Sequence, residues 1–235
     1  MEPTKRPGRT DLLPPEPIPL VDARPLTTPT RRRLPLGTRF VGACWLGACL
    51  VASYVAMRYD FQPGRLGARR SSWPADTTLI SSTSQVTVLA FLHPRCVCTA
   101  ATVKLLVRTL HQHPDSRLIT VVFRPPAPAP AAEWEDAEYV RTIRAEVPAA
   151  CLVLDPGGAE ARRFGVATSG TLLVYDRRGN EIFRGGITAR RGGEDDNPAL
   201  RQFAQALAEE ARSGPDNPPV FGCSLMSFDD QNRQE

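Results

Sequence analysis

The sequence predicts an α/β domain preceded by one N-terminal transmembrane helix. The first observation is an uncharged run of 18 residues, FVGACWLGACLVASYVAM, at positions 40–57. The second is the alternation of short strand-like and helical patterns from about residue 85 onward. The third is a pair of cysteines, Cys96 and Cys98, where the first strand pattern gives way to the first helical one. A chain of 235 residues accommodates one ordinary domain with extensions.

The N-terminal part predicts an anchor. Residues 1–39 are rich in proline and arginine without hydrophobic periodicity, which is typical of a disordered tail. Phe40–Met57 is at the short end of the length needed to span a bilayer. The basic cluster Arg31–Arg33, together with Arg39, favours a cytoplasmic tail and an extracytoplasmic, periplasmic domain. We prefer an uncleaved anchor to a twin-arginine or lipoprotein signal, because the apolar run continues for eight residues after Cys49.

Composition excludes some classes of protein. The net charge of +4 arises largely in the N-terminal tail, and no basic face interleaved with aromatic residues is present, which argues against nucleic-acid binding. Six cysteines at scattered positions do not form the framework of a small disulfide-rich protein.

We divide the chain into the cytoplasmic tail 1–39, the anchor 40–57, a linker 58–74, a folded domain 75–213 and a polar C-terminal tail 214–235. Since every element of the predicted domain lies within 75–213, we expect this part to fold without the anchor. The elements are named in order along the chain: strands at 85–92, 118–123, 151–154, 171–175 and 181–183, and helices at 98–112, 133–145, 159–164 (a single turn) and 197–212.

Local signals support individual elements. In the first helix, Val103, Leu106, Val107 and Leu110 recur at i, i+3, i+4 and i+7, which gives it one apolar face. The sequence Asn197-Pro198 is a good N-cap followed by proline at the first helical position, and Gly214 suits the other end of that helix. The loop Asp176-Arg177-Arg178-Gly179-Asn180 predicts a hairpin between the last two strands.

Two stretches carry a family resemblance. They are VTVLAFLHPRCVC at 86–98, and Phe164-Gly165-Val166 followed by the run from Gly170 to Gly179. Together with the element order, they resemble the thioredoxin fold over about residues 75–213. With the anchor, the chain resembles the membrane-tethered TlpA/RedB-like branch of thiol-disulfide oxidoreductases. The resemblance implies a three-layer sandwich with a central mixed β-sheet, helices on both faces and the Cys96–Cys98 turn at one edge of the sheet.

The resemblance also implies roles for residues. Cys96 matches the attacking cysteine of the family, and Ser169, Gly170 and Thr171 match the loop on which a substrate docks. Two departures touch this site. The family has Cys-x-x-Cys, whereas here Cys98 comes one residue early and Thr99 stands at the expected second position. Gly170 stands where the family has a cis-proline.

The residues themselves favour redox chemistry. A helix N-terminus stabilises a thiolate, and His93 and Arg95 would add positive charge and lower the pKa of Cys96. We therefore expect an exposed, reactive Cys96. Cysteines two apart can close a disulfide, because their Cα atoms can lie within about 4.4–6.8 Å of one another. Cys98 would then resolve a mixed disulfide with a protein thiol or disulfide partner.

Two alternatives remain open. The two thiolates, with His93 or with Cys223 of the tail, would suit a soft ion such as Cu(I), although the spacing matches no strong metal signature. In the second alternative, the fold serves as a non-catalytic scaffold and the thiols have no role in its function. We favour thiol-disulfide exchange without a cofactor. Whether Cys223 approaches Cys96 is not settled by the sequence.

Overall fold

The computed structural model describes residues 36–125, 137–211 and 217–225. Helix α1, Leu36–Asp60, contains the run of residues 40–57 and extends it at both ends. Within its segment Gly37–Asp60, an 18-residue window has a mean hydropathy of 1.8, so the helix is long and apolar enough to cross a membrane, a test that a signal sequence also passes. Of the tail predicted at 1–39, all but the last four residues lie outside the described part of the chain.

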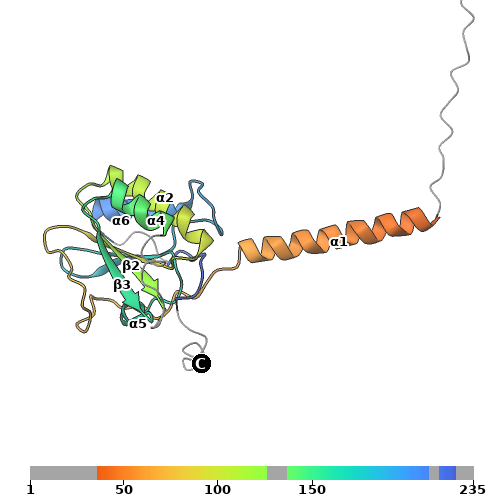
Figure 1. Ribbon diagram of the computed structural model, residues 1–235. Coiled ribbons are helices and arrows are strands. Elements are labelled where there is room, and N and C mark those ends of the chain that lie inside the picture. Colours follow the sequence, from red (N-terminus) through yellow and green to blue (C-terminus); the bar gives the residue numbers. More distant parts are fainter. Residues whose placement is uncertain (1–35, 126–136, 212–216, 226–235) are drawn as a thin grey trace, which may run out of the picture. The chain divides into compact units, whose positions relative to one another are not determined.

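Five strands form one mixed sheet in the order β3-β2-β1-β4-β5 (Figure 1). Strands β1 (Thr87–Leu92), β2 (Arg117–Arg124) and β3 (Cys151–Pro156) run parallel. Strands β4 (Thr171–Tyr175) and β5 (Glu181–Gly185) complete the sheet in antiparallel pairing. The central strand is therefore β1, and the loop after it leaves the sheet where the parallel strands end.

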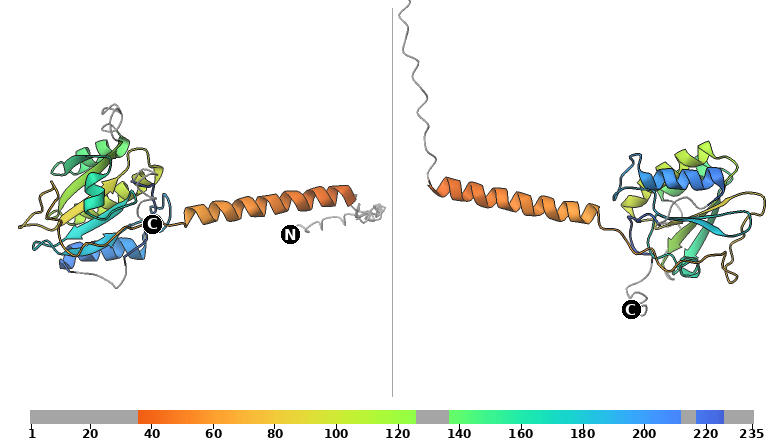
Figure 2. Two further views of the ribbon diagram at one scale, coloured as in Figure 1. Left: turned by 90° about the horizontal axis from the view of Figure 1, so that it is seen from below. Right: turned by 180° about the vertical axis from the view of Figure 1, so that it is seen from behind.

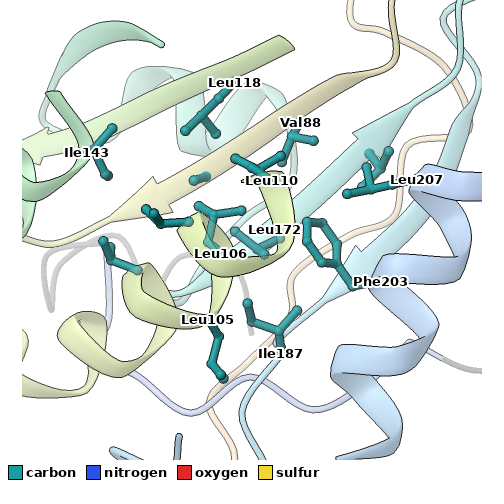
Figure 3. Packing of buried hydrophobic residues seen from close by; sticks show 14 of the residues in the cluster. Val88, Leu105, Leu106, Leu110, Leu118, Ile143, Leu172, Ile187, Phe203 and Leu207 are labelled. Atoms are coloured by element: carbon teal, nitrogen blue, oxygen red, sulfur yellow. The ribbon is translucent and has the colours of Figure 1, made fainter. Parts of the chain in front are cut away.

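One face of the sheet is covered by α2 (Val97–Gln112), α4 (Glu138–Glu146) and α6 (Pro198–Glu209). The three helices lie in one layer, which the right-hand view of Figure 2 also shows. Side chains alternate along β1, so that Val88 faces this layer and Leu89 faces the other. Figure 3 shows the resulting core, in which Leu106 and Leu110 of α2 pack beside Val88 and Leu172.

The opposite face is covered by the short helix α5 (Ala159–Arg163) and by irregular chain. Its core contains an aromatic cluster in which the ring of Trp73 lies 5.1 Å from Phe164 and 4.9 Å from Tyr175. Leu225 is buried in the same cluster. Trp73 belongs to the predicted linker and Leu225 to the predicted tail, so both segments contribute to the packed domain.

The predicted fold class is confirmed: the domain has a mixed central sheet with helices on both faces. The last helix begins as predicted, because Asn197 caps it by accepting a hydrogen bond from the backbone of Leu200 at 3.1 Å. That helix ends earlier than predicted, since Glu210 adopts a left-handed conformation with φ +49°. The predicted start of α4 at residue 133 lies outside the described residues.

Candidate active site

The site is built at the junction between β1 and α2. Cys96 occupies the N-cap of α2 in an extended conformation, and its carbonyl accepts a hydrogen bond from the backbone N–H of Thr99 at 3.0 Å. The first N–H groups of a helix lack partners within it, and the positive end of the helix dipole lies there. The predicted placement of a cysteine at a strand-to-helix junction thus agrees with the structure.

Cys96 is nevertheless only 4% exposed, and Cys98 is 5% exposed. The two thiols are free and not joined. The expectation of an exposed Cys96 is therefore wrong. The reason is tertiary: residues 217–225, which the sequence assigned to a polar tail, return to the domain and pack at this site, with Val220 and Phe221 buried.

This C-terminal segment pairs with the predicted docking loop. The N–H of Ser169 donates to the carbonyl of Cys223 at 2.8 Å, and the N–H of Leu225 donates to the carbonyl of Ala167 at 2.9 Å. Thr168 and Ser224 form an antiparallel bridge between these bonds. The segment 223–225 thus lies as an added strand against residues 167–169.

Gly222 permits this close approach, because a Cβ at that position would lie 1.9 Å from the carbonyl oxygen of Ser169. The guanidinium of Arg191 also donates to the carbonyl of Gly222 at 3.1 Å. The backbone leading into Cys223 is therefore held from two sides.

The docking loop is tied to both elements of the junction. The Oγ of Ser169 accepts a hydrogen bond from the N–H of His93 at 2.8 Å and shares another with the hydroxyl of Thr99 at 2.9 Å. The N–H of Gly170 donates to the carbonyl of Phe91 at 2.8 Å. Gly170 has φ +87°, a conformation that favours glycine. Thr99, where the family has its second cysteine, is therefore a structural tie to the loop.

The surroundings of the three thiols favour a single thiolate, on Cys96. Burial raises the pKa of Cys96, but the thiol of Cys223, the hydroxyl of Thr99, and the backbone N–H groups of Cys223 and Cys98 outweigh burial and lower it. Burial and then the charge on Cys96 raise the pKa of Cys98. Burial, the hydrogen bond to Cys96 and the negative charges nearby raise the pKa of Cys223 to about 12.

His93 and Arg95 lie beside the site. The ring of His93 stacks on the ring of Phe123, with centroids 5.2 Å apart. The backbone N–H of Arg95 donates a hydrogen bond to Nδ1 of His93 at 3.2 Å. Burial, then the charge of Arg95, lowers the pKa of His93, so the ring is neutral at pH 7. A contribution of either residue to the pKa of Cys96 stays a prediction.

A cavity of about 310 Å³ opens beside Cys96, between the start of α2 and α4. Tyr139 is 6% exposed, and its hydroxyl has no hydrogen-bond partner within the described part of the chain. Burial, then the charge on Cys96, raises the pKa of Tyr139, so its hydroxyl keeps its proton. The cavity is wide enough for a side chain of a partner, and its lining includes Pro94, Arg95, Cys96, Val97, Lys104 and Tyr139.

Among the described residues, no group of three or more histidine, cysteine, aspartate or glutamate side chains is arranged to hold a metal ion.

No protein-family model matches the sequence, and no curated protein is significantly similar to it. Among solved structures, the chain is similar to an uncharacterized conserved protein from Geobacillus kaustophilus, with 15% identity over 71% of this chain and 93% of that one, and a TM-score of 0.49. It is similar to a thioredoxin-like protein from Aeropyrum pernix, with 18% identity, coverage of 72% and 99%, and a TM-score of 0.42. It is also similar to a secreted disulfide oxidoreductase from Mycobacterium tuberculosis, with 15% identity, coverage of 54% and 82%, and a TM-score of 0.35.

The class of the protein follows from the fold and the position of the cysteines. The central strand β1 leads into a helix with a cysteine at its N-cap, and the sheet is completed by an antiparallel hairpin preceded by the docking loop. This arrangement agrees with the fold class predicted from the sequence, an α/β domain with a mixed central sheet and the cysteine pair where the first strand meets the first helix.

Proposed function

We propose that this chain is a membrane-anchored thiol-disulfide oxidoreductase of the TlpA/RedB-like kind, with Cys96 as the attacking thiolate. The single observation that carries the proposal is the position of Cys96 at the N-terminus of α2, where hydrogen bonds to its sulfur lower its pKa. A thiolate, and not a thiol, is the species that attacks a disulfide.

The chemistry follows from that thiolate. Cys96 attacks one sulfur of a partner disulfide, a mixed disulfide forms, and the second partner sulfur leaves as a thiolate that takes up a proton. A second thiol of the chain then attacks Cys96 and releases the partner. Cys98 is the thiol that was predicted from the sequence to carry out this step. The cavity beside Cys96 supports access for a partner side chain. Docking of the partner backbone on Ser169, Gly170 and Thr171 would require the segment 223–225 to move aside, because the N–H of Ser169 is bonded to the carbonyl of Cys223.

The test is the pH dependence of alkylation of Cys96 in the reduced full-length chain, held in detergent. We expect the rate to reach half its maximum at a lower pH than free cysteine does, because the thiolate of Cys96 is stabilised by hydrogen bonds. The absolute rate should stay low, since the sulfur is shielded. Iodoacetamide labelling, read by mass spectrometry of the peptide that starts at Cys96, gives this profile.

Free cysteine measured in the same buffer is the reference. A profile at or above that of free cysteine would falsify the enzymatic proposal. Stoichiometric binding of Cu(I) by a chain that exchanges no disulfide would favour the metal-carrier alternative instead.

The anchor gives a separate prediction. Because Gly37–Asp60 is apolar and long enough to span a bilayer, we expect the chain to stay in the membrane fraction after a carbonate wash. The basic residues before it should place the domain outside the cytoplasm, so that protease added to intact spheroplasts digests it. Release by carbonate, or a domain protected until the membrane is opened, contradicts this topology.

A further inference from the structure

The third cysteine of the site lies on the C-terminal segment, 127 residues away from Cys96 in sequence. Its position is fixed by backbone hydrogen bonds. Ser169 binds the carbonyl of Cys223, and Ser169 itself bonds to Thr99 in the first turn of α2. Cys223 is therefore held beside the N-terminus of α2 by the same loop that the sequence nominated for substrate docking.

The segment lies on this loop as an extended partner chain would. Residues 223–225 pair with 167–169 in antiparallel fashion, with two backbone hydrogen bonds and one bridge. Its flanking side chains Val220, Phe221 and Leu225 are buried, which fixes the segment in place. Cys223 itself is exposed, so its sulfur can be reached from solvent while it contacts the buried Cys96.

Cys98 is less well placed to bond to Cys96. It lies in the first turn of α2, two residues after the N-cap Cys96, and its backbone N–H and its thiol also bond to the sulfur of Cys96. A disulfide between cysteines two apart closes a small ring, however, and its geometry is expected to strain the turn that carries Cys98. Cys223 lies on a separate segment, so a bond between Cys96 and Cys223 closes no small ring within the first turn of the helix.

We propose that Cys223, and not Cys98, is the thiol that resolves the mixed disulfide on Cys96, so that the oxidised form of the domain carries a Cys96–Cys223 disulfide. This inference rests on the proposed function, because it requires that Cys96 first forms a mixed disulfide.

The step balances as an ordinary exchange. The sulfur of Cys223 loses its proton and attacks the sulfur of Cys96. The Cys96–Cys223 bond forms, the bond between Cys96 and the partner breaks, and the partner sulfur leaves with the electron pair and takes up a proton. Overall, two thiols of the chain are oxidised and one partner disulfide is reduced to two thiols.

The electrostatics set the order of events. While Cys96 is a thiolate, its charge and its hydrogen bond help to keep the pKa of Cys223 high, so Cys223 stays protonated. Once Cys96 is part of a mixed disulfide, that charge is gone, whereas the guanidinium of Arg191 still lowers the pKa of Cys223. Cys223 therefore becomes easier to deprotonate at the point where its attack is needed.

The experiment oxidises the reduced full-length chain in detergent with glutathione disulfide, quenches with acid and maps tryptic peptides by mass spectrometry. Cleavage after Arg95 and Lys104 places Cys96 and Cys98 in the peptide 96–104, and cleavage after Arg212 and Arg233 places Cys223 in the peptide 213–233. A Cys96–Cys98 disulfide stays within one peptide, whereas a Cys96–Cys223 disulfide joins two.

We expect the joined peptides in the unchanged chain and in Cys98→Ser. In Cys223→Ser, we expect the mixed disulfide of Cys96 with glutathione to accumulate as the main oxidised form. Cys151→Ser removes an exposed cysteine on β3 and should behave like the unchanged chain. The linkage in the unchanged chain is read without any substitution, so it does not depend on how a variant folds.

Two results overturn the inference while the proposed function stands. One is a disulfide within 96–104 that disappears in Cys98→Ser, together with unchanged oxidation of Cys223→Ser. The other is a joined pair of peptides that disappears in Cys98→Ser, which would assign the bond to Cys98 and Cys223. If Cys96 takes up no glutathione in any variant, the proposed function itself fails.

Discussion

Replacing Cys96 with serine is expected to reduce disulfide exchange by the full-length chain to the rate measured without protein. A serine hydroxyl stays protonated near neutral pH and does not attack a disulfide, so no mixed disulfide forms. Reduction of insulin disulfides by the chain, with dithiothreitol as the source of electrons, measures this loss.

The matched control is Cys151→Ser, which makes the same chemical change at an exposed cysteine of β3 and should leave the rate unchanged. Folding of each variant is checked by circular dichroism. Full activity of Cys96→Ser would show that another thiol attacks, and equal losses in both variants would point to a general effect on the fold.

Hydrophobic periodicity and the residues that bound helices and strands were enough to predict the sheet and its helices. The strand at 171–175 was predicted to the residue, because its apolar run is bounded by glycine on one side and a turn-forming aspartate on the other. The helix α2 was predicted to within one residue from its apolar spacing. These signals are local, so they can be recognised in the sequence without knowledge of the fold.

The remainder of the site depends on contacts distant in sequence. No motif around Cys223 predicts its role. The apolar pair Val220–Phe221, within a polar stretch, is the sequence feature that indicates that this segment packs on the domain. Trp73 was likewise assigned to the linker, because its contacts with Phe164 and Tyr175 come from residues far away in the sequence. The shielding of Cys96 follows from the return of residues 217–225 to the domain and could not be foreseen from the residues next to Cys96 in sequence.

Arg184 is the clearest such case, because a charged side chain in a strand is ordinarily predicted to face solvent. It is instead buried, and it donates to Glu181 at 2.7 Å. It also donates to the carbonyls of Phe164 and Gly165 at 2.8 and 3.0 Å. The guanidinium thus joins β5 to the chain that leads into the docking loop.

Replacing Arg184 with methionine is therefore expected to lower the free energy of unfolding by about 3 kcal/mol, because two buried carbonyls lose their donor and the buried carboxylate of Glu181 is left with Arg69, at 3.1 Å, as its ion-pair partner. For a domain of this size, the loss corresponds to a fall in Tm of about 6–12 °C, read by thermal circular dichroism. The exposed pair of Arg177 with Glu210 supplies the control: Arg177→Met should cost no more than about 1 kcal/mol. Pairing Arg184→Met with Glu181→Leu should recover part of the loss, since the buried carboxylate is then gone, although the partly exposed Arg69 loses its ion pair with Glu181 in this variant. Equal effects of Arg184→Met and Arg177→Met would show that the buried guanidinium does not hold residues 164–165 to the sheet.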